Sequence, residues 1–400
     1  MRVGTPGFVP ARLEEARAAR RIKTQKKLAE WLNVAASTVS RWQQGEIAPD
    51  TEALAALASA FEVRREFFLR PVYNSARPMF HRALSSTLAS DIRYQKSQMN
   101  WLHEISSVLQ HYVDFPPIDI PDVLGGASWK QLRETDIERI ALELRAHWKI
   151  GEGPCGDIIA LLERVGVIVG TIEMGTARLD GLCSWSSNEQ RPHILLATDK
   201  MSFPRRQMDG AHELAHAVLH RGVTEDEFRE NLKDIERQAF RLASAFLMPS
   251  TTYPHEVRRP SLANFLSLKE RWRVSIKAQI HRLADLGIIP DEYVTDLYKL
   301  HSAKGWTKEE PLGREWSLTE PRTLRDALNL LVGSGIRTKE DLLRVEFTMS
   351  SADIERLAAL SSGWFKEKAG ELVQLRSERG RSRESSAETG TVIPFTKRPN

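Results

Sequence analysis

Between residues 10 and 68, apolar side chains recur every three or four positions, a spacing typical of short amphipathic helices. Thr24 and Asp50 precede two of these stretches, and such residues cap helices because their side chains accept hydrogen bonds from free backbone N–H groups. Asn33 and Gly45 stand at the ends of the second and third stretches and tolerate the left-handed conformation in which many helices end. The pattern therefore predicts a bundle of five short helices.

The third of these helices, expected from Ala35 to Gln44, carries few apolar residues, and we expect only Val39 and Trp42 to point inward. A polar, arginine-bearing helix after a tight turn suits the major groove of DNA. The alternative is a bundle that contacts another protein while its polar face is merely solvated. That face carries Ser37, Thr38, Ser40, Arg41 and Gln43.

The order of residues in this bundle resembles the XRE-type helix-turn-helix family. The resemblance implies a DNA-binding domain over residues 8–70. By position, it implies that Gln25, Ser37, Thr38 and Arg41 meet the DNA. The matching residues are Thr24-Gln25-x-x-Leu28-Ala29, Asn33-Val34, Ser37-Thr38-Val39-Ser40-Arg41-Trp42 and Gly45.

Residues 71–128 are expected to hold a linker and one bracing helix. The stretch 71–78 contains Pro, Asn and Ser residues, which favour loops. Apolar residues between 92 and 113 recur at helical spacing, and the prolines between 116 and 121 prevent that helix from continuing. No residue pattern in this region indicates chemistry.

The region 129–295 is expected to form a domain of mixed α and β structure. Helical patterns over 135–148 and 157–164 precede three stretches of β-branched and aromatic residues, which predict a small sheet. Ser202 and Pro204 suit the cap and the first turn of the helix that follows the sheet. The three predicted strands are 165–171, 179–186 and 193–197.

That helix contains His212-Glu213-Leu214-Ala215-His216, the one H-E-x-x-H motif in the chain. Residues four apart share one face of a helix, so both imidazoles can bind the same metal ion. Glu213 lies about 100° round the helix from His212, where it can act on a metal-bound water as a general base. Because the motif also occurs by chance on ordinary helices, the presence of a third ligand is decisive.

His220 is poorly suited to be that third ligand. On an unbroken helix it lies about 12 Å along the axis from His212, too far for both residues to reach one ion at about 2.1 Å. We expect His220 to be hydrogen bonded at the end of the helix instead.

The next helix, expected over 231–248, offers a better ligand. On a wheel at about 100° per residue, its apolar side chains fill slightly less than half of the circumference, and Glu236 lies in the middle of that arc. Arg237 and Arg241 fall on the opposite side and are expected to face solvent. A carboxylate within an apolar face needs a cationic partner or a helix to cap. With two histidines some twenty residues upstream, a metal ion is the favoured partner.

This set of motifs resembles the ImmA/IrrE metallopeptidase family over residues 135–289. The resemblance implies that His212, His216 and Glu236 bind zinc and that Glu213 activates water. The matching pieces are Asp180-Gly181, Ile194-Leu195, the five residues from His212 to His216, Leu219-His220, Glu236-x-x-Ala239 and Phe246-Leu247-Met248-Pro249.

The remaining segments complete the expected architecture. Residues 266–289 form a second helix-turn-helix-like element, which either holds a protein substrate or DNA or simply packs on the core. Residues 296–376 are expected to form a helical appendix of unknown role. Residues 377–400 are rich in Ser, Arg and Glu near their start and should be disordered. The expected fold class is α+β and predominantly α, with an N-terminal helix-turn-helix bundle and a zincin-like peptidase domain that holds the sheet.

The composition, 41% hydrophobic and 28% charged, is typical of a soluble globular protein. The chain has no run of about 18 apolar residues for a membrane span, and its first residues lack the apolar core of a signal peptide. Cys155 and Cys183 are too few for a disulfide framework, so we expect reduced thiols in a cytoplasmic protein. The net charge of +4 permits nucleic-acid binding without requiring it.

These expectations combine into a cytoplasmic zinc metallo-endopeptidase joined to a DNA-binding domain. The family resemblance implies a repressor-type protein as substrate, whose cleavage controls a stress or mobile-element operon. The alternative is a transcriptional regulator whose zinc domain senses a partner or a metal without cutting. A purely structural zinc site is less suited, because three ligands leave one coordination position open beside Glu213.

Overall fold

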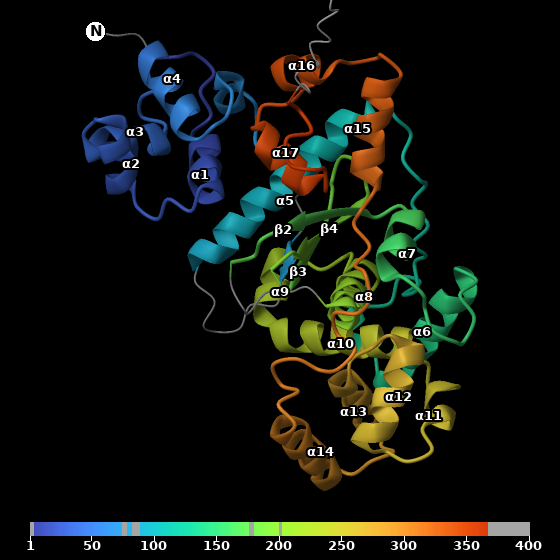
Figure 1. Cartoon of the computed structure of the whole chain (residues 1–400). Coiled ribbons are helices and arrows are strands. Elements are labelled where there is room, and N and C mark those ends of the chain that lie inside the picture. The colour runs from blue at the N-terminus through green and yellow to red at the C-terminus, as the bar shows by residue number, and fades with distance from the viewer. Residues whose placement is uncertain (1–3, 74–77, 82–88, 176–179, 200–201, 367–400) are drawn as a thin grey trace, which may run out of the picture. The chain divides into compact units, whose positions relative to one another are not determined.

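The computed structural model describes residues 4–73, 78–81, 89–175, 180–199 and 202–366. These residues, up to Phe365, belong to one compact unit. The tail that was expected to be disordered, residues 377–400, lies outside the described residues. The fold is α+β and predominantly α, as predicted (Figure 1).

The N-terminal bundle has the predicted helices and the predicted caps. Thr24 and Asp50 each accept a hydrogen bond from a backbone N–H group in the first turn of the helix that they precede. Asn33 and Gly45 follow two helices in the left-handed conformation, with φ of 52° and 75°. Local side-chain chemistry therefore sets the limits of these helices. They are α1 (Pro10–Ala19), α2 (Gln25–Leu32), α3 (Ala36–Gln44), α4 (Thr51–Ala60) and the 3-10 helix η1 (Arg65–Leu69).

Among the described residues, the sheet has four strands, one more than predicted, in the order β1-β3-β4-β2. The additional strand, β1, is two residues long and lies in the region expected to be a linker, where Phe80 pairs with Cys183. So short a strand shows no alternation of apolar and polar residues, and it exists because β3 offers a partner. β2 and β4 are parallel, and the other neighbours are antiparallel. The strands are β1 (Phe80–His81), β2 (Ile168–Ile172), β3 (Gly181–Trp185) and β4 (Pro192–Ala197).

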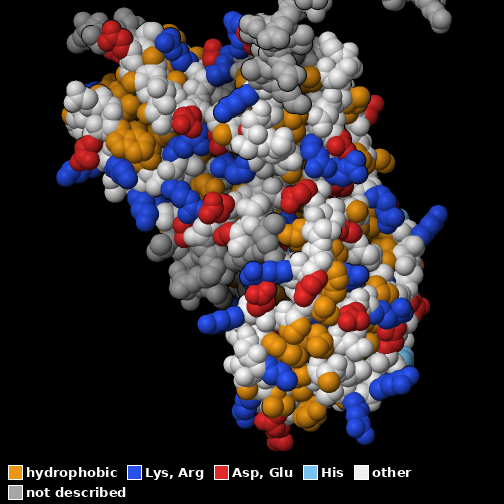
Figure 2. All heavy atoms as spheres, viewed as in Figure 1, with side chains coloured by type: hydrophobic (Ala, Val, Ile, Leu, Met, Phe, Trp, Pro, Cys, Tyr) orange, Lys and Arg blue, Asp and Glu red, His pale blue; other side chains and the backbone are white. Residues whose placement is uncertain are grey.

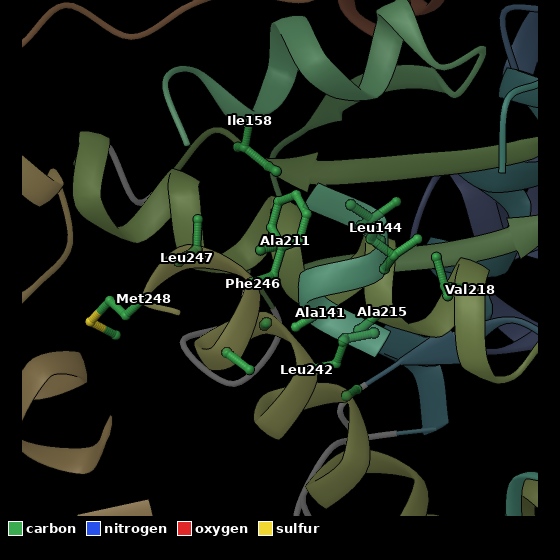
Figure 3. Packing of buried hydrophobic residues seen from close by; sticks show 14 of the residues in the cluster. Ala141, Leu144, Ile158, Ala211, Ala215, Val218, Leu242, Phe246, Leu247 and Met248 are labelled. Carbon is green, nitrogen blue, oxygen red and sulfur yellow. The ribbon is translucent and has the colours of Figure 1, made fainter. Parts of the chain in front are cut away.

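Alternate residues of the strands enter two hydrophobic cores, one on each face of the sheet. Val169 and Cys183 belong to the first core, which also contains apolar side chains of many helices, among them four that pack on one another. Figure 3 shows Ala211 and Ala215 of one helix, and Leu242 and Phe246 of another, among the side chains of this core. These four helices are α6 (Glu134–His147), α7 (Ile158–Arg164), α8 (Phe203–Leu219) and α10 (Leu232–Leu247).

The second core lies on the other face of the sheet and includes Ile168 and Leu182. It also contains the apolar side chains of the N-terminal bundle, of the bracing helix and of the C-terminal helices. The appendix of unknown role is thus an integral layer of the fold, which covers the sheet. The bracing helix is α5 (Ala89–Gln110). The C-terminal helices of this layer are α15 (Thr323–Gly333), α16 (Lys339–Asp341), the π-helix η3 (Leu342–Glu346) and α17 (Ser351–Leu357).

The predicted helix-turn-helix-like element consists of two helices, α12 and α13, joined by a turn. Arg273 in this turn is left-handed with φ of 55°, and Ser275 caps α13 through the backbone N–H of Ala278. The expected domain boundary between residues 295 and 296 falls inside the next helix, α14, so it does not separate two structural elements. The remaining helices are η2 (Trp129–Gln131), α9 (Glu225–Glu230), α11 (Tyr253–Glu256), α12 (Leu262–Trp272), α13 (Ile276–Asp285) and α14 (Asp291–Ala303).

Within the described ranges, no helix is both long and apolar enough to cross a membrane. Cys155 and Cys183 are free thiols, the second of them buried. On the face seen in Figure 2, Lys and Arg side chains are interspersed with Asp and Glu side chains. Charge on that face therefore does not mark out a separate basic surface.

Candidate metal centre

Helix α8 carries both histidines of the H-E-x-x-H motif on the face that it turns toward α10. Its first turn follows Ser202 and contains Pro204, as predicted, although the Ser202 side chain makes no capping hydrogen bond. The helix packs against β3 and β4, and the indole N–H of Trp185 in β3 donates a hydrogen bond to the carbonyl of Ala217 at 3.2 Å. This packing orients α8 so that the Nε2 atoms of His212 and His216 lie 3.1 Å apart.

Glu236 on α10 completes a group of three. Its Oε2 lies 3.4 Å from Nε2 of His212, and its Oε1 lies 3.4 Å from Nε2 of His216. The three ligand atoms that could hold an ion lie within 4.8 Å of one another. The structure thus brings together His212 and His216 of α8 with Glu236 of α10, the three residues that the sequence analysis expected to bind a metal ion.

The donor set suits a metal ion. Neither carboxylate oxygen of Glu236 has a normal hydrogen-bond partner, although both are buried, and two imidazole nitrogens converge on them. Burial alone raises the pKa of Glu236, but its contacts with His212 and His216 outweigh burial and hold that pKa well below its ordinary value. Two imidazoles and one carboxylate are the ligands of many catalytic zinc sites.

Glu213 lies beside this group and faces β3. An added Cβ at Gly181 would lie 2.6 Å from Oε1 of Glu213, so the glycine makes room for the carboxylate. Burial first, and then the carboxylate of Glu236, raise the pKa of Glu213 well above its ordinary value. A cation between the two carboxylates would offset their repulsion and favour the charged form of Glu213.

Two aromatic side chains enclose the centre. The ring of Phe80 in β1 stacks on His216 with centroids 5.0 Å apart and an angle of 7° between the planes. The ring of Phe240 lies 4.2 Å from that of His212. As a result, the side chains of the motif are nearly inaccessible, with exposed fractions of 5% for His212, 3% for Glu213 and 0% for His216.

Phe240 also borders two clefts, of about 900 Å³ and about 370 Å³. The larger cleft extends from Phe240 along the start of α8 toward α13, and it is lined by side chains of both charges, including Arg205, Asp209 and Lys277. The smaller cleft lies between α6 and α10 and includes Gln238 and Arg241. Both clefts reach the immediate surroundings of His212.

His220, the residue that follows α8, has the role expected from helix geometry. Its Nδ1 lies 3.1 Å from Nδ1 of His216, and its Nε2 lies 3.1 Å from Oε1 of Gln238. His220 is therefore hydrogen bonded on the side of His216 that faces away from Glu236.

One expectation about α10 needs correction, and one buried residue of that helix was not foreseen. Arg241 does not face solvent, because its side chain is 11% exposed and its Nε donates to Oε1 of Glu138 at 2.9 Å. Gln238 is buried, although the wheel gave no sign of it. In both cases the partner comes from a segment about a hundred residues earlier in the chain, which the periodicity of one helix cannot reveal.

The four expected DNA contacts lie on α2 and α3. Gln25 is half-buried and donates a hydrogen bond to the side chain of Gln43, which ties α2 to α3. Ser37 and Arg41 are exposed, and Thr38 is half-buried. The guanidinium of Arg41 also contacts the carboxylate of Glu46 at 3.2 Å.

Two segments of the chain match models of known families. Residues 162–284, from α7 to α13, match the IrrE N-terminal-like domain of the M78 peptidases. Residues 13–68, from α1 to η1, match a helix-turn-helix family. No curated protein matches the chain. The chain thus combines a helix-turn-helix domain, a match that supports DNA binding, with a peptidase-like domain that contains His212, His216 and Glu236.

Proposed function

We propose that this protein is a DNA-binding zinc metallo-endopeptidase, which cleaves a repressor protein and so controls transcription of a stress or mobile-element operon. The observation that carries the proposal is the convergence of two imidazoles and one carboxylate beside a second, buried carboxylate. The match to a peptidase family over the same residues agrees with it.

In this proposal His212, His216 and Glu236 hold the zinc ion. When bound, zinc supplies a Lewis acid that polarises the peptide carbonyl and lowers the pKa of a water molecule. Glu213 accepts the proton of that water on its carboxylate and later donates it to the leaving amine. Gly181 leaves room for the Glu213 side chain beside these ligands, because it has no Cβ to occupy the space.

Through the helix-turn-helix domain, the proposed peptidase binds DNA, where a DNA-bound regulator is available as its substrate. We infer that it binds an operator through Gln25, Ser37, Thr38 and Arg41. A repressor bound at the same regulatory region would then be held close to the clefts beside Phe240. The mixed charges that line the larger cleft suit a polypeptide more than a small apolar ligand.

The burial of the centre favours a second candidate function. Because His212, Glu213 and His216 are almost inaccessible, a polypeptide reaches them only if the segments that carry Phe80 or Phe240 move. A regulator that binds zinc as a sensor, and never cuts, needs no such movement. The two candidate functions differ in what Glu213 does.

A Glu213→Gln variant separates them. It removes the proposed base and leaves the three ligands in place, so we expect zinc binding and operator binding to persist. Cleavage of the repressor should fall by at least about 10²-fold. The substrate can be sought with the same variant, by capturing small helix-turn-helix proteins encoded beside it and incubating each with the wild-type protein. If the variant regulates transcription as the wild type does, the protease proposal is wrong and the sensor is favoured.

DNA binding is tested on α3. Arg41→Ala should weaken binding to the operator and lower the slope of log K against log salt by about 1, because one phosphate contact is lost. Arg344→Ala is the control, since Arg344 is also exposed and paired with a glutamate but lies in η3, outside the helix-turn-helix domain. Equal affinities and equal slopes for the two variants would point to a protein contact instead of a DNA contact.

A further inference from the structure

A chain of buried hydrogen bonds leads from the candidate metal centre to the protein backbone. It begins at Nδ1 of His216, 3.1 Å from Nδ1 of His220, and continues from Nε2 of His220 to Oε1 of Gln238, also 3.1 Å. It ends where Nε2 of Gln238 donates to the backbone carbonyl of Trp129 at 3.0 Å. His216, His220 and Gln238 are all buried.

The last acceptor fixes the direction of every bond in the chain. The carbonyl of Trp129 can only accept, so the amide nitrogen of Gln238 faces it and the amide oxygen faces His220. That oxygen also only accepts, so Nε2 of His220 carries the hydrogen. A neutral imidazole protonated at Nε2 has a free lone pair at Nδ1, and this lone pair accepts the Nδ1–H of His216. The Nε2 lone pair of His216 is then directed toward His212 and Glu236.

We propose that His220 and Gln238 are positioning residues, which hold His216 in the Nδ1–H tautomer with Nε2 ready to bind a metal ion. The inference rests on the proposed function only in that the centre takes up a metal. Residues that hydrogen bond to a metal-bound histidine in this way fix its tautomer and its ring orientation.

The acceptor for His216 is a neutral imidazole, whereas many metal-binding histidines donate to a carboxylate or a carbonyl. Glu213 and Glu236 already place two carboxylates in this buried space. A third carboxylate behind His216 would add to their repulsion, and a neutral acceptor avoids it. Phe80 and Trp129 pack on the ring of His220, each with centroids 5.9 Å away, and leave it little freedom to turn.

The tautomers can be tested without a metal, by measuring the ¹⁵N chemical shifts of the histidine ring nitrogens in the metal-free protein by NMR. We expect Nδ1–H at His216 and Nε2–H at His220. In Gln238→Leu, which removes the acceptor for Nε2–H, His220 should populate both tautomers. The opposite tautomers in the wild-type protein would overturn the inference, whatever the fate of the proposed protease activity.

The consequence for metal binding is measured by competition for Zn²⁺ with a chromogenic chelator. His220→Phe keeps an aromatic ring but removes the acceptor, so zinc affinity should fall by about 10–100-fold. His220→Gln offers a carbonyl oxygen and should recover part of the loss. The control is His103→Phe, because His103 is a buried histidine whose ring nitrogens have no hydrogen-bond partner among the described residues.

If His220→Phe fails to fold, zinc affinity is measured in Gln238→Leu instead, where we expect a smaller loss of affinity. Wild-type zinc affinity in both variants, with native circular dichroism, would show that the chain of hydrogen bonds does not position His216. Loss of proteolysis in Glu213→Gln is a separate result, because zinc binding by the His220 variants is measured without substrate.

Discussion

At the scale of single residues, the contact between Gly181 and Glu213 links the sheet to the proposed chemistry. A Cβ at residue 181 would lie 2.6 Å from Oε1 of Glu213 and 2.9 Å from its Cγ, and real contacts are never that short. Gly181→Ala should therefore displace the carboxylate by about 1 Å, which can slow catalysis by about 10²-fold. The three ligands do not touch Gly181, so zinc binding should persist. Repressor cleavage and zinc affinity measured on the same sample check both statements.

Gly333→Ala is the matched control, since a Cβ there meets no atom within 4 Å. We expect full activity and unchanged or slightly higher stability for this variant. If Gly181→Ala also cleaves at the wild-type rate, the position of Glu213 does not depend on β3.

Most of the candidate centre could be found from sequence because its residues obey the geometry of single helices. His212, Glu213 and His216 are related by the turn of α8, and Glu236 stands out as a carboxylate in the apolar face of α10. Gln238 and Phe80 could not be found in this way. Their importance comes from contacts with Trp129 and His216, which depend on how distant segments pack.

At the scale of elements, a carboxylate on α6 joins three helices. Glu138 accepts two hydrogen bonds from Arg282 of α13, at 2.6 and 2.7 Å, and one from Arg241 of α10 at 2.9 Å. The Nε of Arg282 also donates to the carbonyl of Met248 just after α10. These bonds hold the helix-turn-helix-like element against the helix that carries Glu236, so the packing interpretation of that element has a physical basis.

The Glu138→Gln variant should lower the free energy of unfolding by about 3 kcal/mol at pH 7, because it leaves the buried Arg282 without its charge partner. Burial raises the pKa of Glu138, but its bonds with Arg282 and Arg241 outweigh burial and lower that pKa below its ordinary 4.5. The folded state therefore gains stability from the carboxylate above about pH 4.5, and loses it as the pH falls toward the lower folded pKa. Urea denaturation of wild type and variant should differ less at pH 4 than at pH 7.

Glu143→Gln on the same helix is the control. Glu143 pairs with Arg139 in solvent, where both side chains are at least half exposed, so its loss should cost less than about 1 kcal/mol at either pH. A difference for Glu138→Gln that stays constant with pH would show that packing, and not charge, joins these helices.

Helices were predicted best where residues close in the sequence determine their ends. The caps at Thr24 and Asp50 and the left-handed Asn33 need only neighbouring residues, so α2 and α4 begin and α2 ends close to the predicted positions. The two residues of β1 do not by themselves predict a strand, because so short a strand forms only against a partner. The boundary expected between residues 295 and 296 lies within α14, because residues 291–303 form one continuous helix.

At the scale of the whole described unit, the sheet lies between two cores, and the helix-turn-helix domain belongs to the second of them. Phe67 of η1 and Leu13 of α1 share this core with Ile354 of α17 and with Ile168 of β2. A helix-turn-helix domain of about 60 residues buries little surface alone, so it gains stability from this shared core. The predicted domain boundaries therefore separate the sequence motifs, whereas this hydrophobic core continues across those boundaries.

An ion pair in this shared core provides the test. Arg20, the residue that follows α1, donates two hydrogen bonds to Asp353 of α17, at 2.9 and 2.7 Å, and Asp353 is 2% exposed. Asp353→Asn keeps the shape of the side chain but removes its charge, so we expect a loss of about 3 kcal/mol in the free energy of unfolding. Because the pair connects α1 to the layer that covers the sheet, amide hydrogen exchange should become faster in α1 to α4 as well as in α17.

The control is Asp326→Asn in α15, since Asp326 is half exposed and pairs with Arg322 in solvent. Its exchange rates should match those of the wild type throughout. If Asp353→Asn speeds exchange only in α17 and leaves α1 to α4 protected, the helix-turn-helix domain is stable by itself. Faster exchange in both regions would mean that α17, which packs on β2, carries part of the stability of the DNA-binding domain.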